Sequence, residues 1–163
     1  MLLGLLCTVP AFAQMPPVPA ELKEVDYMTG HWEGDMTMGE MKMKAKMDCD
    51  KVLGGRYIQQ MHKYSGQGSP EMSGMMLLSY DENAKNWIGW WYDSTATGTL
   101  EMKGALDAGT ITLTSQPTEM PGMGKVVMRS IWTKVSDTHM KLKVEMQSGT
   151  EWTTFVTADM TKK

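Results

Sequence analysis

The chain has 163 residues, the length of one domain with or without a leader. Its hydrophobic fraction of 42% supports a packed core and excludes disorder throughout the chain. Sixteen basic and nineteen acidic side chains give a net charge of −3, which argues against a nucleic-acid-binding protein. Two counts are unusual, because 19 methionines and 6 tryptophans stand beside only 2 phenylalanines.

The first thirteen residues, 1–13, carry no charge and end in an Ala-x-Ala motif at 11–13. This pattern is typical of a secretory signal peptide, and the stretch is shorter than the roughly 20 apolar residues that span a bilayer. We therefore expect an exported protein, periplasmic or secreted, that begins near Gln14 after cleavage. Lipidation at Cys7 is a weaker alternative, because Leu6 stands where a small residue is expected.

Residues 14–19 hold three prolines and predict an extended tether, and residues 20–163 follow as a single domain. Cleavage of the leader removes Cys7 and leaves Cys49 as the only cysteine, which excludes an intramolecular disulfide. Cys49 is then a small buried apolar residue, a reactive thiol or one half of an intermolecular disulfide. Aspartates on both sides of Cys49 disfavour the thiolate.

One short amphipathic helix is expected directly after the tether. Pro19 suits the first helical position, and Gly30 suits the position just past the C-terminus. Between them Leu22, Val25 and Met28 fall on one helical face.

After this helix the apolar pattern changes to a period of two. Residues 139–146 alternate polar and apolar without a break, and residues 110–114 do the same. Turn signals separate about ten short segments of this kind, which predicts an all-β, antiparallel sandwich or barrel. We favour a barrel because closure removes exposed strand edges.

Several short motifs are shared with known families. Gly30-His31-Trp32 after a short helix resembles the Gly-x-Trp opening of calycin-type, lipocalin-like barrels. The segments 53–57, 80–85 and 90–94 read LGGRY, YDENAK and WWYDS. In this order and spacing they resemble a bacterial family catalogued as a domain of unknown function, number fifteen-seventy-nine.

The resemblance implies a lipocalin-like barrel and no established activity. In calycins a late arginine packs over the early tryptophan and closes one end of the barrel. Here the matching position near the C-terminus is Lys162, which lacks the planar guanidinium that stacks on an indole. The resemblance therefore implies contact between Lys162 and Trp32, without the arginine that is usual there.

Four methionines flank a predicted two-residue turn at Gly39-Glu40. Such a turn places Met38 opposite Met41, and Met36 opposite Met43, all on the face that Trp32 shares. Three interpretations follow: flexible core filler, an adaptable wall for an apolar ligand, or a thioether site for Cu(I) or Ag(I).

An aromatic run forms the second conspicuous feature. In one strand Trp87 and Trp91 share a face, whereas Trp90 and Tyr92 share the other. The run is either core or a platform for a ligand inside the barrel. Arg56, one of two arginines, is either solvated or paired with a ligand carboxylate.

No motif for nucleophilic, phosphate-binding or zinc-dependent catalysis is present, so an enzyme is not indicated. Haem ligation through His31, His62 or His139 has little support, and no cofactor, metal site or membrane span is assigned. We predict an exported protein that binds a small apolar or amphipathic molecule in the barrel. The alternative is a methionine-rich protein that handles Cu(I) or Ag(I), or that absorbs oxidants. The candidate ligand-binding residues are Trp32, Met36, Met38, Met41, Met43, Arg56, Trp87 and Trp91.

Overall fold

The computed structural model describes residues 17–68, 70–120 and 123–163. The predicted leader, 1–13, and residues 14–16 of the predicted tether lie outside the described residues, and both stay predictions. Within the described ranges the chain forms two 3-10 helices, η1 Ala20–Met28 and η2 Leu53–Gly55. The strands in the same ranges are β1 Gly30–Met38, β2 Met41–Val52, β3 Tyr57–Gly66, β4 Met72–Asp81, β5 Asn86–Asp93, β6 Leu100–Asp107, β7 Thr110–Ser115, β8 Thr118–Met120, β9 Gly124–Ser136, β10 His139–Ser148 and β11 Glu151–Lys162.

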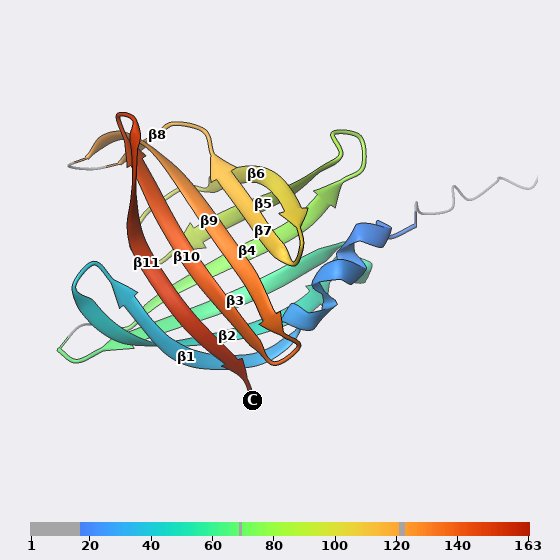
Figure 1. The fold of residues 1–163 in the computed structure, drawn as a ribbon, viewed down its shortest axis with the longest axis horizontal. Helices are drawn as coiled ribbons and strands as arrows, with labels where there is room; N and C mark the ends of the chain where they lie inside the picture. The colour runs from blue at the N-terminus through green and yellow to red at the C-terminus, as the bar shows by residue number, and fades with distance from the viewer. Residues whose placement is uncertain (1–16, 69, 121–122) are drawn as a thin grey trace, which may run out of the picture.

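Ten of these strands close into an antiparallel barrel (Figure 1). Neighbours along the chain pair from β1 to β7, then β7 pairs with β9, β9 with β10 and β10 with β11. The pairing of β11 with β1 completes the circle, and β8 adds a short edge on β9 alone. The expected all-β, about ten-stranded barrel is confirmed.

The period of two decides which side chains point inward. Along β2, Met43, Ala45 and Met47 are buried, whereas the lysines between them are exposed. Each strand therefore gives one apolar face to the interior and one polar face to solvent.

The methionine hairpin has the predicted register. Met36 lies opposite Met43, and Met38 lies opposite Met41. Gly39 in the turn has φ of +58°, a left-handed value that favours glycine. The Gly39 amide also donates to the Phe155 carbonyl at 2.9 Å, so the turn is held against β11.

The N-terminal helix is a 3-10 helix rather than an α-helix. Its inward residues Leu22, Val25 and Met28 recur every three positions, which matches three residues per turn, and each is at most 1% exposed. Pro19 is the residue before the first helical position, and Thr29 follows the last one.

Trp32 fills the end of the barrel next to η1 and is 0% exposed. Its indole Nε1–H donates to the Met28 carbonyl at 2.7 Å, which joins β1 to the helix. Lys162 lies opposite Trp32 in the sheet, and its Nζ is 5.2 Å from the centre of the Trp32 ring. The contact implied by the resemblance is present, and a cation–π interaction replaces guanidinium stacking. We call this end, with η1 and Trp32, the closed end.

We expect Trp32→Ala to lower the free energy of unfolding by about 3–5 kcal/mol, because it empties a fully buried site. Urea denaturation followed by circular dichroism measures the change. Lys162→Met is the control and should cost less than about 1 kcal/mol, since it removes only the cation over the ring. An unfolding midpoint unchanged by Trp32→Ala would contradict the packing described for the closed end.

Candidate ligand-binding site

The two ends of the barrel differ in how well their apolar side chains are covered. At the closed end Leu22, Val25, Met28 and Trp32 are at most 1% exposed. Nine apolar residues pack against the core with partial exposure, and of these Tyr80 and Leu106 lie toward the closed end and seven lie at the opposite end. We call these seven the open-end residues, and they are Met38, Tyr64, Met72, Trp91, Leu100, Val144 and Phe155.

Trp91 is the largest of the open-end residues and is held from two sides. Its Nε1–H donates to an Asp93 carboxylate oxygen at 3.1 Å. Its six-membered ring lies over Gly74, where an added Cβ would come within 2.3 Å of two ring carbons. Burial raises the pKa of Asp93, but hydrogen bonds from Thr95, Trp91 and the Ala96 amide outweigh it, so the pKa is lowered on balance. Asp93 therefore stays ionised and orients the indole.

His62 lies inside the barrel beneath the open-end residues. It faces inward from β3 opposite Met47 on one side and Gly74 on the other. Its ring centre is 5.2 Å from that of Trp91, 5.8 Å from Tyr64 and 5.9 Å from Trp132. His62 is 3% exposed, so three aromatic rings and the sheet enclose it almost completely.

A second polar side chain, Gln60, lies one inward position further from the open end and is 1% exposed. The Gln60 amide contacts His62 Nε2 through Oε1 at 3.3 Å, and its Nε2 donates to Met28 Sδ at 3.6 Å. A short polar chain thus runs from the closed end to the centre of the barrel. Burial lowers the pKa of His62 to about 3, so the imidazole is neutral at physiological pH.

The structure divides the eight predicted residues into three groups. Trp32 and Trp87, 0% and 3% exposed, belong to the closed half, and the Arg56 guanidinium there donates to the Pro17 carbonyl at 2.9 Å. Met36 and Met43 form a buried pair in the wall, and the open end receives Met38, Met41 and Trp91. Trp87 and Trp91 share the inward face as predicted.

Met41 differs from the other hairpin methionines because it is 49% exposed. It faces the same side as Met43 but stands at the tip of the hairpin, beyond the reach of the core. The interior wall therefore contains Met36, Met43 and the half-buried Met38, whereas Met41 has the predicted pairing and face but lies outside the core. Binding of Cu(I) by these thioethers stays a prediction.

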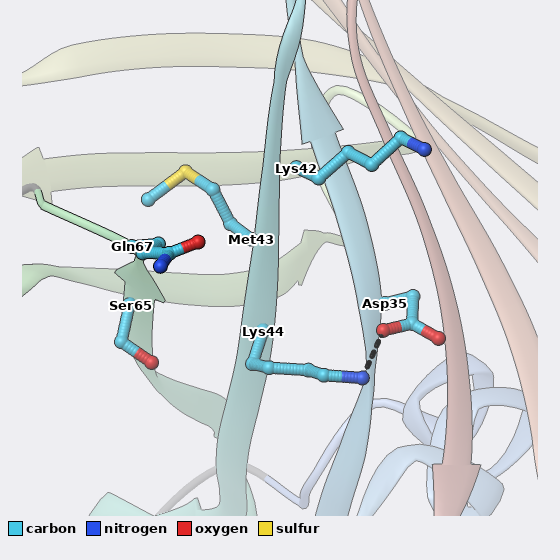
Figure 2. A pocket seen from close by; sticks show the side chains of 7 residues that line it. Asp35, Lys42, Met43, Lys44, Ser65 and Gln67 are labelled. Carbon is cyan, nitrogen blue, oxygen red and sulfur yellow. Dashed lines mark hydrogen bonds and ion pairs between the residues drawn. The ribbon is translucent and has the colours of Figure 1, made fainter.

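Two depressions lie on the outer wall of the barrel, and charged side chains contribute to both. One, of about 520 Å³, is lined by residues of β1, β2 and the end of β3. Figure 2 shows Lys42 and Lys44 extending from β2 to the side of Asp35, whereas Met43 extends to the other side. The second, of about 800 Å³, is lined by residues of β1, β2, β9, β10 and β11. In its lining Lys141, Lys143 and Asp159 stand beside apolar side chains, which include Met36, Met43, Ile131 and Leu142.

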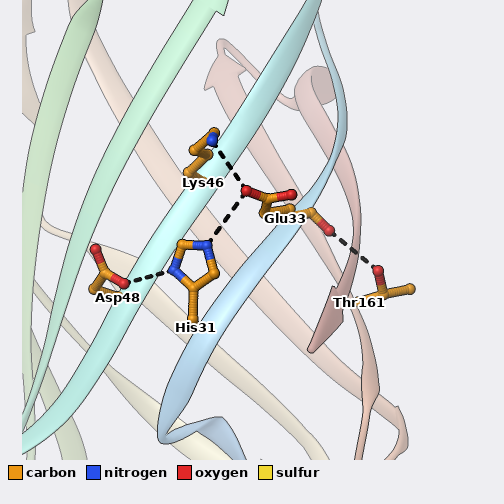
Figure 3. A network of polar contacts seen from close by, with 5 residues as sticks. All are labelled: His31, Glu33, Lys46, Asp48 and Thr161. Carbon is orange, nitrogen blue, oxygen red and sulfur yellow. Dashed lines mark hydrogen bonds and ion pairs between the residues drawn. The ribbon is translucent and has the colours of Figure 1, made fainter. Parts of the chain in front are cut away.

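A chain of polar contacts around His31 also lies on the outer wall (Figure 3). His31 Nδ1 is 2.6 Å from Asp48 Oδ1, and its Nε2 is 3.3 Å from Glu33 Oε1. Hydrogen bonds from the imidazole to Asp48 and Glu33 raise the pKa of His31. Lys46 Nζ ends the chain of contacts, at 3.0 Å from Glu33 Oε1. His31 is therefore part of a charged network on the surface and does not face the interior.

Cys49 and Arg129 are accounted for by local contacts. Cys49 is 1% exposed and burial raises its pKa to about 12, so the thiol stays protonated, as expected of a small buried residue. Arg129 Nε donates to Glu145 at 2.8 Å, and its guanidinium lies 4.0 Å from the centre of the Trp152 ring. Within the described ranges no three His, Cys, Asp or Glu side chains are arranged to hold a metal ion.

Sequence reasoning did not assign the residues that surround His62. The sequence names His62 only as a possible haem ligand, and its patterns do not single out Gln60, Tyr64 or Trp132. The sequence does contain a signal for this cluster. Successive residues of a strand point to opposite faces, so Gln60, His62 and Tyr64 lie on the same face as Ile58. Polar residues on an apolar face are the observation that finds this cluster.

The ten-stranded closed barrel, with a helix and a tryptophan at one end, defines a lipocalin-like protein. A family model described as "Protein of unknown function (DUF1579)" matches residues 20–162. The chain belongs to this family, as the motifs in its sequence suggested. No protein of curated function matches the sequence.

A solved structure with a similar fold is that of the S-type phycobiliprotein lyase CPES from Guillardia theta. The alignment has a TM-score of 0.55 at 12% sequence identity, and it covers 86% of this chain and 91% of the lyase. At this identity the likeness shows a shared calycin-like fold. Separately, no helix of the described ranges is long and apolar enough to span a membrane.

The buried His62 predicts a specific dependence of stability on pH. Because its pKa falls from 6.5 to about 3 on folding, the unfolded chain takes up a proton between these values and the folded chain does not. Stability contributed by neutral His62 is complete above pH 6.5 and is lost as the pH falls toward 3. By pH 4.5 the loss reaches about 2–3 kcal/mol.

The measurement is urea unfolding of wild type and His62→Leu at pH 7 and pH 4.5. The difference between the two pH values should be about 2–3 kcal/mol smaller in the variant. Comparing differences cancels the carboxylates and His31, which titrate in both proteins. Equal pH dependence in the two proteins would show that His62 is not buried in the neutral form.

Proposed function

We propose that this protein is an exported binding protein that holds a small apolar or amphipathic molecule at the open end of its barrel. The observation that carries the proposal is the difference between the two ends. At the closed end Leu22, Val25, Met28 and Trp32 are at most 1% exposed, whereas Trp91, Tyr64 and their neighbours at the other end keep exposed surface. Apolar and aromatic side chains with a few polar groups among them are the usual lining of a small-molecule site.

The composition of this end suits an apolar or amphipathic ligand. Of the seven open-end residues, only Tyr64 and Trp91 carry an O–H or N–H group, and two of the others, Met38 and Met72, are methionines. Methionine side chains adapt to irregular shapes because they are unbranched and polarizable. The similar fold of a phycobiliprotein lyase supports the binding of a small molecule.

The binding test uses N-phenyl-1-naphthylamine, whose fluorescence rises in apolar surroundings. Wild-type protein should bind the probe, and Trp91→Leu should raise the Kd by about five- to tenfold, the contribution of one aromatic contact. Trp90→Leu is the matched control, because Trp90 is on the same strand but faces outward. The Trp90 indole donates to Glu101 at 3.2 Å, and its ring centre is 6.1 Å from that of Tyr57.

Trp90→Leu should leave the Kd within about twofold of the wild-type value, because it removes an outward contact. Equal weakening by Trp90→Leu and Trp91→Leu would mean that the probe senses general loosening of the barrel. Stronger weakening by Trp90→Leu would place the site on the outer wall and contradict the proposal.

Export rests on the apolar leader and its Ala-x-Ala motif at residues 11–13. Amino-terminal sequencing of the protein from its native cells should therefore begin at Gln14 or within a few residues of it. Replacing Ala13 by a bulky residue should block this cleavage, because signal peptidase accepts small side chains there. An intact amino-terminal methionine on the native protein would contradict export by this route.

A further inference from the structure

We propose that His62 Nδ1 is the hydrogen-bond acceptor for the ligand, so that the site selects molecules carrying a single hydroxyl or N–H donor in an otherwise apolar framework. The inference rests on the proposed function, since it concerns a ligand that enters at the open end. It adds a chemical class to that ligand and names the atom that recognises it.

The hydrogen-bond partner of the His62 imidazole identifies the nitrogen that carries the proton. His62 Nε2 is 3.3 Å from Gln60 Oε1, and an amide oxygen only accepts hydrogen bonds. The orientation of this amide is fixed on its other side, where Gln60 Nε2–H donates to Met28 Sδ at 3.6 Å. His62 Nε2 therefore holds the proton.

The other imidazole nitrogen, Nδ1, has no donor among the residues that the structure describes. Burial lowers the pKa of His62 to about 3, so the ring carries one proton and Nδ1 has a free lone pair. Within the described part of the chain, the only hydrogen bond of the His62 ring is the one to Gln60. Nδ1 is thus an acceptor without a protein donor, on a side chain that is 3% exposed.

Aromatic rings surround the imidazole that carries this acceptor. The rings of Tyr64, Trp91 and Trp132 lie 5.2–5.9 Å from the His62 ring, centre to centre. Tyr64 and Trp91 are also open-end residues, so His62 contacts the same rings that a ligand at the open end would contact. Aromatic and apolar ligand surfaces suit these rings, and a single donor suits Nδ1.

The charges around Nδ1 narrow the class of ligand further. Nδ1 accepts one hydrogen bond, the neutral imidazole offers no positive charge to a carboxylate, and the ionised Asp93 beside Trp91 disfavours an anion. The Trp91 N–H is already paired with Asp93, so a neutral molecule with one donor fits better than an anion. A molecule of the same shape without the donor leaves Nδ1 unpaired and binds less tightly.

The test compares two probes of nearly equal shape, 1-naphthol with its hydroxyl donor and 1-methoxynaphthalene without it. Quenching of tryptophan fluorescence gives the Kd of each probe for wild type, His62→Leu and the control His139→Leu. His139 faces the outer wall and lies 2.7 Å from Asp159. Comparing the ratio of the two Kd values between wild type and each variant removes the intrinsic difference in polarity between the probes.

We expect the preference for 1-naphthol to fall about fivefold in His62→Leu, the value of one net hydrogen bond, and to persist in His139→Leu. Binding of both probes with the same ratio in wild type and His62→Leu would overturn the role of His62 and leave the proposed function intact. Failure of wild type to bind either probe would overturn both.

A measurement on the wild type alone keeps the inference testable if His62→Leu does not fold. In the free protein, ¹⁵N spectra of the histidines should show His62 as the Nε2–H tautomer. Adding 1-naphthol should move the Nδ1 resonance toward the values of a hydrogen-bonded acceptor, and adding 1-methoxynaphthalene should not. A proton on Nδ1 in the free protein, or equal shifts with the two probes, would overturn the inference.

Discussion

Burial of Trp32 against η1 is the contact on which the remaining arrangement depends. A closed barrel satisfies the hydrogen bonds of its strands, but it leaves two ends at which apolar side chains would meet water. At one end the Trp32 ring fills the interior, its N–H is satisfied by the Met28 carbonyl, and Lys162 covers the ring. In the proposed function a ligand therefore enters from the other end, past the open-end residues.

The interior between these ends is built with methionine where other barrels have leucine and phenylalanine. Met36, Met43, Met47, Met76 and Met102 are each at most 4% exposed. Their flexible thioethers pack around fixed rings such as Trp87 and Trp132, and they do so without branched side chains that would restrict the strands. The same property lets the open end adapt to a ligand, so core filling and ligand binding are compatible uses of one residue type.

Local patterns predicted the features that depend on one or two neighbouring strands. The turn at Gly39 was enough to give the pairing of Met36 with Met43, and the period of two along β5 gave the shared face of Trp87 and Trp91. Features that depend on the position along the barrel axis were not predictable in this way. The exposure of Met41 and the placement of Arg56 beside Pro17 follow from which end each strand terminus occupies. The cluster at His62 needs three strands and a helix to be placed at once, because its rings come from β3, β5 and β9 and its partner Gln60 donates to Met28 of η1.

The most direct test of this account follows the six indole N–H signals in ¹H–¹⁵N spectra while N-phenyl-1-naphthylamine is added. Trp32 and Trp91 report on the two ends, since their N–H groups donate to Met28 and Asp93. The account predicts that the Trp91 signal shifts with saturation, whereas the Trp32 signal stays in place. A shift of the Trp32 signal without one at Trp91 would contradict a site at the open end.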